Sequence, residues 1–233
     1  MASEKSFQDR IQHTNDLSAA VPLLTPVYTP VDSKFTLAKL TTATTAAEAA
    51  NANVEAKRIP YQDPTSDRVA LVKTIGPLVT QALAYVKSNT AWENRHEAVK
   101  NAADKVRGVR PPKPKPVDPD PDQKTRETGE RSYVEIAGHF KTFINRLDGL
   151  AGYAPQDEKI SIDLLNDLHA ELDSYNKSIP TASQALADAI IDRQDLFTGP
   201  TGLKFVFDGV KASVKGQYGH TSLQYKAVSG ISW

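Results

Sequence analysis

The residues of this chain that could take part in chemistry are few and scattered. Five histidines are spread over the sequence, and the absence of cysteine excludes disulfides, thiolate metal sites and cysteine nucleophiles. Glu93 and His96 have the spacing that places a carboxylate and an imidazole on one helix face, as in di-metal helical bundles. The second half of the chain offers no second Glu-x-x-His, so the pattern argues against a metal site. Asp163, Asp167 and Glu171 step by four residues and indicate a solvated helix face.

Motifs that bind nucleotides or activate a nucleophile are also missing. The sequence contains no Gly-x-x-x-x-Gly-Lys or Gly-x-Gly-x-x-Gly loop to hold phosphate, and no Gly-x-Ser-x-Gly elbow. We therefore predict a protein that is not an enzyme and that needs no cofactor.

Composition excludes further classes of partner. Lys plus Arg and Asp plus Glu number 28 each, so the formal net charge is zero, and a basic footprint for nucleic acid is lacking. No run of about 18 apolar residues is present, which predicts no membrane span. The first residues lack the apolar core of a secretory signal, which predicts a cytoplasmic protein. A processed exported chain would look the same.

The pattern of apolar residues predicts an all-α protein. From Ser132, apolar residues step by three and four, as on one face of a helix that ends at Gly149 and Gly152. A second stripe begins near Asp157 and runs past Pro180, where we expect a kink or a break between two helices. A last helix is expected after Gly199 and Pro200.

The first half gives a weaker helical pattern. An Ala- and Thr-rich helix is expected over 33–57, a second over 66–88 with a bend at Pro77, and a third from Trp92 to Val106. The segment around Phe7, Ile11 and Leu17 is expected to be helical and to end before Pro22.

A charged, proline-rich stretch separates the two halves. Six prolines between Pro111 and Pro121 forbid a helix and favour an extended spacer, although Pro111 and Pro114 also have the PxxP spacing of a ligand for a proline-recognising domain. We predict a first helical repeat over 1–106, a linker over 107–131, and a second repeat with a C-terminal tail over 132–233.

The word repeat rests on a match within the sequence. A shift of 125 positions places Tyr28 and Pro30 on Tyr153 and Pro155, and further identities follow in the same register. They include Asp32 with Asp157, Leu40 with Leu165, Asn51 with Asn176, Asp67 with Asp192, Arg68 with Arg193 and Leu71 with Leu196. We predict an antiparallel helical bundle built from two tandem repeats, packed as one bundle or as two domains.

Two repeated residues are candidate binding residues. Arg68 and Arg193 both fall on an apolar stripe, where an unpaired charge would be costly to bury. A structural partner such as a nearby carboxylate or helix carbonyls is the favoured interpretation, and a bound anion is the alternative. Asp32 and Asp157, each after a Tyr-x-Pro turn, are expected near helix starts.

The C-terminal tail ends on a large aromatic residue. It packs either across its own bundle or into a groove of a neighbouring molecule, where Tyr225, Val228, Ile231 and Trp233 would be the docking residues.

The ending Tyr218-Gly-x-x-Ser-x-Gln-Tyr-Lys-x-Val-x-Gly-Ile-Ser-Trp233 resembles that of helical proteins of Bacteroidota that have no known activity. The resemblance covers mainly the second half and implies no functional residues.

Together these patterns predict a structural or scaffolding protein. Its partner would be protein: another copy of itself in a homo-oligomer, or a different protein that it binds as an adaptor. The alternative is a bundle that binds a small molecule or a metal, centred on Arg68, Arg193 or Glu93 with His96.

Overall fold

The computed structural model describes residues 4–109 and 132–233, and over these residues the protein is all-helical, without strands. The predicted all-α class is therefore confirmed. The proline-rich part of the predicted linker, 110–131, lies outside the described residues.

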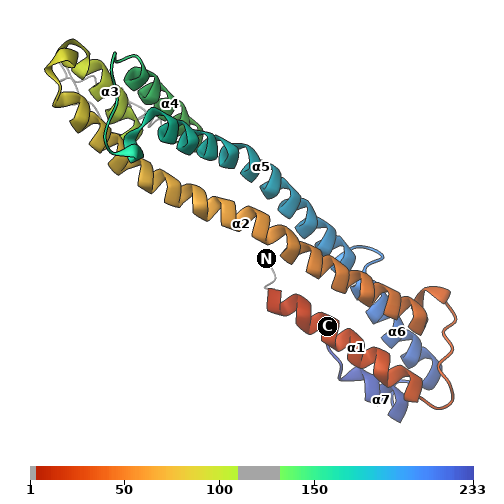
Figure 1. Cartoon of the computed structure of the whole chain (residues 1–233). Coiled ribbons are helices and arrows are strands. Elements are labelled where there is room, and N and C mark those ends of the chain that lie inside the picture. The colour runs from red at the N-terminus through yellow and green to blue at the C-terminus, as the bar shows by residue number, and fades with distance from the viewer. Residues whose placement is uncertain (1–3, 110–131) are drawn as a thin grey trace, which may run out of the picture. The chain divides into compact units, whose positions relative to one another are not determined.

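Seven α-helices and four short 3-10 helices make up the described chain (Figure 1). The α-helices are α1 (Glu4–Ala20), α2 (Leu37–Lys87), α3 (His96–Arg107), α4 (Tyr133–Asp148), α5 (Ile162–Thr198), α6 (Leu203–Tyr218) and α7 (Leu223–Ser229). The 3-10 helices are η1 (Val21–Leu23), η2 (Ser33–Phe35), η3 (Thr90–Arg95) and η4 (Glu158–Ile160).

Local sequence explains several helix ends. Ser132 accepts a hydrogen bond from the backbone N–H of Glu135, and the Glu135 carboxylate accepts one from the Ser132 N–H, which is a capping box at the predicted start of α4. Gly108 ends α3 with φ 68°, a left-handed conformation that favours glycine. The helix predicted from Trp92 begins instead as η3, and α3 starts at His96.

The long helix α2 corrects one prediction: the break expected between 57 and 66 is absent, because α2 continues through Pro60 and Pro64. Of the two alternatives expected at Pro180, the break is excluded, because α5 is one helix of 37 residues with Pro180 inside. The kinks expected at Pro180 and at Pro77 stay predictions. Each proline removes one hydrogen bond, at a cost of about 3 kcal/mol. Buried residues on both sides of these prolines, such as Leu40 and Ile75 in α2, keep both arms of the helix packed.

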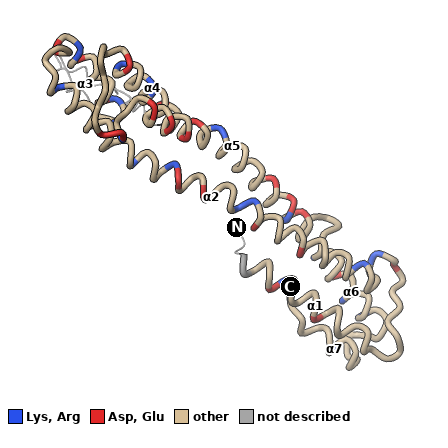
Figure 2. Tube along the Cα trace, in the orientation of Figure 1, with Lys and Arg blue, Asp and Glu red and all other residues tan. Residues whose placement is uncertain are grey.

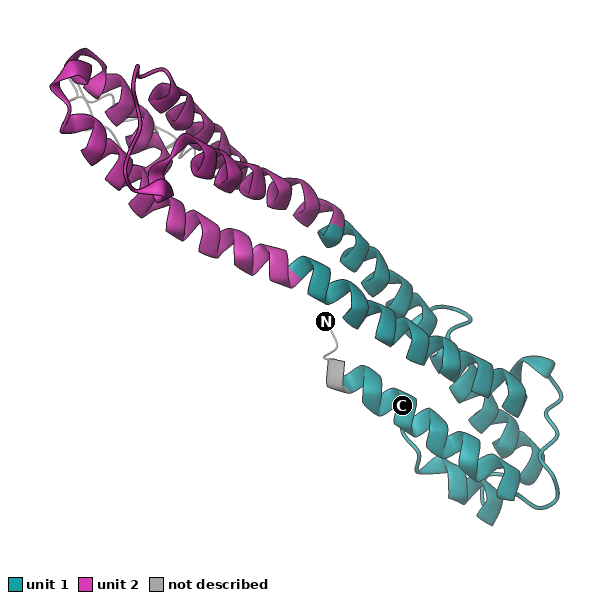
Figure 3. Ribbon diagram, viewed as in Figure 1, with its two compact units in different colours: residues 1–61, 182–233 teal, residues 62–181 magenta. Residues whose placement is uncertain are grey.

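The chain divides into two compact units, shown in different colours in Figure 3. Unit 1 consists of residues 1–61 and 182–233, and unit 2 consists of residues 62–181. Both divisions fall beside the prolines of the long helices, between 61 and 62 in α2 and between 181 and 182 in α5. Each unit contains residues from both predicted halves, 1–106 and 132–233. Those halves were predicted from the internal sequence repeat, and the repeat stays a prediction.

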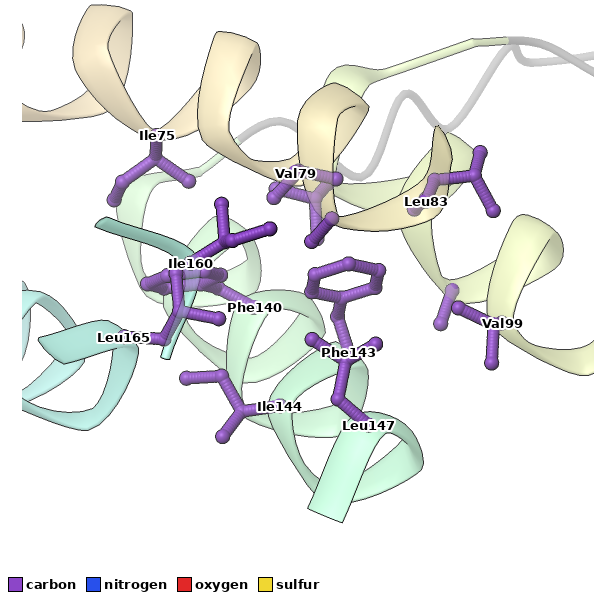
Figure 4. Close-up of a cluster of buried hydrophobic side chains, with 14 of the residues drawn as sticks. Ile75, Val79, Leu83, Val99, Phe140, Phe143, Ile144, Leu147, Ile160 and Leu165 are labelled. Carbon is purple, nitrogen blue, oxygen red and sulfur yellow. The ribbon is translucent and has the colours of Figure 1, made fainter. Parts of the chain in front are cut away.

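The core of unit 2 is aromatic and aliphatic (Figure 4). Phe140, Phe143 and Leu147 of α4 are fully buried, and they face Ile75 and Val79 of α2. The other labelled members of the cluster are Leu83 of α2, Val99 of α3, Ile144 of α4, Ile160 of η4 and Leu165 of α5.

The core of unit 1 gathers residues from five α-helices. It contains Leu17 of α1, Leu40 of α2, Phe197 of α5, Phe207 of α6 and Val228 of α7, each at most 1% exposed. The rings of Phe7 and Phe197 meet edge to face, with centroids 4.8 Å apart, a geometry that aromatic pairs favour.

Helix α2 is long and apolar enough to cross a membrane by length and composition alone. This is weak evidence, because a core helix passes the same test, and Leu71, Ile75, Val79, Ala82, Leu83 and Val86 of α2 are buried in the core of unit 2. The predicted absence of a membrane span stays a prediction.

A glycine in α6 allows a close contact inside unit 1. A Cβ added at Gly209 would lie 2.1 Å from the Phe35 ring, so the ring occupies the space that any other residue would fill. At Gly216, on the same helix, an added Cβ would meet no atom within 4 Å.

We expect Gly209→Ala to destabilise the protein by about 1–3 kcal/mol, because the Phe35 ring must move. Gly216→Ala is the matched control and should stabilise the helix by about 0.5–1 kcal/mol. Thermal and denaturant unfolding measure both. Adding Phe35→Leu to Gly209→Ala should restore part of the loss, and equal effects of the two alanines would contradict the contact.

Candidate functional site

The four predicted tail residues lie against the core of unit 1. Val228 is fully buried, and Tyr225, Ile231 and Trp233 are partly buried beside it. The Trp233 ring lies 5.4 Å from the ring of Phe207, centroid to centroid. Within the chain, the tail therefore covers its own bundle, and its insertion into a neighbouring groove stays a prediction.

A lysine of α6 fastens the tail. The Lys211 Nζ donates hydrogen bonds to the carbonyl oxygens of Ser229 and Ile231, at 3.1 and 2.6 Å. The Arg10 guanidinium of α1 lies 5.5 Å from the centre of the Trp233 ring, within the range of a cation–π contact. Cutting the chain after Val214 would remove core as well as surface.

Apolar side chains project from the segment that joins α1 to α2. Leu23 is 81% exposed, Val27 is 78% exposed and Val31 is fully exposed. Leu223, the first residue of α7, is 80% exposed. We call these four residues the apolar rim. Single exposed apolar residues are ordinary on protein surfaces. Several exposed apolar residues on one short segment are typical of interaction surfaces.

Hydrogen bonds from α6 and α7 hold the backbone of this segment in place. Tyr218 donates to the Pro26 carbonyl, Gln217 donates to the Val27 carbonyl at 2.9 Å, and Gln224 donates to the Thr25 carbonyl at 2.7 Å. The Gln217 oxygen also accepts from the Thr29 N–H. The rim is therefore ordered before any partner arrives, so less conformational entropy is lost on binding.

Arg193 is a buried charge inside unit 1. It is 4% exposed, and its Nη1 donates to the side-chain oxygen of Asn51 at 3.0 Å. Its guanidinium lies 4.1 Å from the centre of the Phe7 ring. The amide oxygen and the ring face both favour the cation. They differ from the carboxylate or helix carbonyls that were expected as its partner, and the structural role stays a prediction.

Arg68 has the corresponding surroundings inside unit 2. Its Nη1 donates to the side-chain oxygen of Asn176 at 3.2 Å, and its guanidinium lies 4.0 Å from the centre of the Tyr133 ring. The Asn176 amide donates in turn to the Tyr133 carbonyl at 3.0 Å. The two asparagines stand 125 positions apart, as do the two arginines.

The Tyr-x-Pro turns have a defined geometry. Tyr28 donates to the Phe35 carbonyl at 2.8 Å, and Tyr153 donates to the Ile160 carbonyl at 2.8 Å. Burial raises the pKa of Tyr153 well above its ordinary value, with a further contribution from Tyr85, and burial also raises that of Tyr28.

The aspartates that follow these turns are helix caps, as predicted. Asp32 accepts from the Lys34 N–H at 2.9 Å, and Asp157 accepts from the Lys159 N–H at 3.0 Å. Hydrogen bonds from Gln81 and from the Lys159 N–H lower the pKa of Asp157.

The candidate metal residues have different surroundings. The His96 Nε2 donates to the Val86 carbonyl oxygen at 2.9 Å. Asp163, Asp167 and Glu171 are exposed. Over residues 4–109 and 132–233, no group of three or more histidines and carboxylates is placed to hold a metal ion.

Comparison with protein-family models, with curated proteins and with solved structures finds no match to this chain. The resemblance to helical proteins of Bacteroidota therefore stays a prediction.

Sequence reasoning singled out the two arginines but missed the apolar rim. Leu23, Val27 and Val31 lie in a segment broken by Pro22, Pro26 and Pro30, so they show no helical period. The available signal was the four-residue spacing of apolar residues between those prolines.

We predict a coupling energy of about 1.5–3 kcal/mol between Arg193 and Asn51, the range for hydrogen bonds to charged groups. A double-mutant cycle of Arg193→Met and Asn51→Ala, followed by denaturant unfolding, measures it. The cycle of Arg68→Met and Asn176→Ala is the matched comparison and should give a smaller value, because Arg68 is less buried. Additive single effects at Arg193 and Asn51 would contradict the pairing.

The tyrosine turns predict a loss of stability in alkali. A raised pKa in the folded state means that the neutral phenol stabilises the fold fully below pH of about 10, and that this contribution disappears as the pH rises through the folded pKa. Tyr153→Phe should cost about 1 kcal/mol at neutral pH through the lost hydrogen bond to Ile160. Its unfolding free energy should then fall less steeply than that of the wild type above pH of about 10. Parallel pH profiles for the two proteins would contradict this.

Proposed function

We propose that this chain is a non-enzymatic helical-bundle subunit, built by duplication of an antiparallel helical unit, that associates with further copies of itself through the apolar rim. The observation that carries the proposal is the exposure of Leu23, Val27, Val31 and Leu223 on backbone that hydrogen bonds hold in place. Water-exposed apolar side chains on an ordered segment lower the free energy most when a partner covers them.

Charge supports a second copy as the partner. The formal net charge is zero, so two copies meet without net electrostatic repulsion. Figure 2 shows acidic and basic residues mixed along α2, whereas α5 carries seven acidic residues and two basic ones.

The engagement of the chemically capable side chains supports a role without catalysis. Asp32 and Asp157 cap helices, and His96 bonds to a backbone carbonyl. Tyr28 and Tyr153 fasten turns. Groups that are committed to backbone hydrogen bonds contribute to the fold and are not poised for proton transfer to a substrate.

Duplication is supported by contacts that recur with the 125-residue shift. The hydrogen bond from Tyr28 to the Phe35 carbonyl recurs from Tyr153 to the Ile160 carbonyl. Helices α2 and α5 begin at Leu37 and Ile162, which are also 125 positions apart. Two halves of independent origin would not be expected to share this hydrogen bond and these helix starts at the same spacing.

The arginine contacts support the antiparallel arrangement. Arg68 of α2 contacts Asn176 of α5, and Arg193 of α5 contacts Asn51 of α2. Within unit 2, Gln81 of α2 also donates to Asp157, just before α5, so the partner's residue number falls from 176 to 157 as the number along α2 rises from 68 to 81. Each arginine meets the asparagine of the other half, so the proposed repeats exchange equivalent contacts.

The test is molar mass in solution, by size exclusion with light scattering over a range of concentrations. The wild type should exceed the monomer mass of 25.4 kDa as concentration rises. The triple variant Leu23→Ser, Val27→Ser, Val31→Ser should remain monomeric while its unfolding free energy changes little, because exposed positions tolerate substitution.

Ile59→Ser with Val134→Ser is the matched control, since these residues are 63% and 67% exposed but lie outside the rim. This control should assemble as the wild type does. A monomeric wild type at every concentration would contradict self-association and favour an adaptor with a different protein partner. Unchanged assembly of the triple variant would place the interface elsewhere.

A further inference from the structure

A hollow of about 550 Å³ opens on unit 2, between α2, α3 and α4. Its apolar lining consists of Val72, Ile75, Val106, Tyr133 and Ile136. A volume in this range suits a small ligand, since ligand pockets of proteins commonly measure about 300–1,000 Å³. The hollow is distinct from the apolar rim, which belongs to unit 1.

A glycine leaves part of this space open. Gly76 lines the hollow from the interior of α2, and a Cβ added there would meet no atom within 4 Å. Packing against a neighbour therefore does not explain the glycine. Pro77 follows Gly76 and crowds a Cβ on the preceding helical residue, and the missing side chain leaves the hollow open at this point.

The charged residues that line the hollow are all basic. Lys73, Lys105 and Arg107 contribute to it, and none of its described lining residues is acidic. Arg107 is engaged by the Asp104 carboxylate and by the Thr80 hydroxyl. Over the described residues, Lys73 and Lys105 form no ion pair, so their ammonium groups are the ones that an incoming anion would meet. Lysine stems can cover apolar surface while the charged ends stay at its edge.

We propose that this hollow binds an amphiphilic anion, a small molecule with an apolar body and one anionic head, of the class of a medium-chain carboxylate. The apolar body lies on Val72, Ile75 and Val106, and the head meets Lys73 and Lys105. Burial of the apolar body supplies most of the affinity, and the two ammonium groups select for the sign of the head.

Calorimetric titration of the full chain with three ligands of equal tail tests the selection. The ligands are decanoate, a neutral decyl glucoside and decyltrimethylammonium, each below its micelle concentration. Decanoate should bind at least about tenfold more tightly than the glucoside, and the cation should bind most weakly. Equal affinities for the three, or no binding of decanoate, would overturn the proposal.

Two variants locate the site. Lys73→Gln with Lys105→Gln should weaken decanoate binding about tenfold and change glucoside binding less than twofold. Lys39→Gln with Lys57→Gln alters net charge equally at exposed positions of unit 1 and is the matched control, expected to bind decanoate as the wild type does. Equal losses in both pairs would show a non-local charge effect and overturn the site.

Gly76→Leu should fill the hollow and abolish binding of decanoate and of the glucoside. Gly76→Ala is its folding control and should bind decanoate while changing thermal stability little, because the helix preference of alanine is opposed by crowding between its Cβ and the Pro77 ring. Wild-type affinity in a folded Gly76→Leu protein would overturn the proposal, and the lysine variants decide the matter if that protein does not fold. The rim triple variant should bind decanoate as the wild type does, because its hollow is unaltered. Decanoate binding is thereby tested separately from self-association.

Discussion

Helices α2 and α5 each supply buried residues to the cores of both compact units. The remaining helices pack against these residues. Leu40 and Ala47 of α2 enter the core of unit 1, and Ile75 and Val79 of the same helix enter the core of unit 2. Helix α5 does the same with Phe197 and Leu172. Backbone hydrogen bonds are missing at Pro60, Pro64 and Pro77 of α2 and at Pro180 of α5. Packing on either side of each proline offsets this loss.

Each unit also contains a polar contact between an arginine and an asparagine. Arg193 with Asn51 belongs to unit 1, and Arg68 with Asn176 belongs to unit 2. A buried charge tolerates only the helix alignment that delivers its partner, because an unpaired charge in the interior is costly. Aliphatic stripes alone would allow neighbouring helices to slide by a turn. The arginine contacts thus add specificity to cores whose stability comes from apolar burial.

The sequence predicted the helices most reliably where local signals agreed. The apolar stripe after Ser132 and the residues of its capping box set the start of α4, and Asp32 and Asp157 marked short capped turns. The predicted break in α2 was wrong, because the local cost of proline was weighed without the packing that offsets it, whereas a single helix through Pro180 was one of the two expected alternatives. For the candidate sites, the sequence singled out Arg68 and Arg193 but not their asparagine partners, since that contact joins distant parts of the chain. The rim and the hollow at Gly76 depend on side-chain exposure and on empty space, for which the sequence carries little signal.

The order of segments along the chain bears on how the protein is made. Unit 2 is one continuous stretch, whereas unit 1 needs residues 1–61 and 182–233 together. At a ribosomal rate of about 5–20 residues per second, the intervening stretch takes roughly 6–24 s to synthesise. During that interval the apolar faces around Phe7, Leu17 and Leu40 have no α6 to pack against. Nascent chains on one polysome therefore have time to exchange helices with each other. We expect a chaperone to bind the N-terminal helices until residues 182–233 emerge.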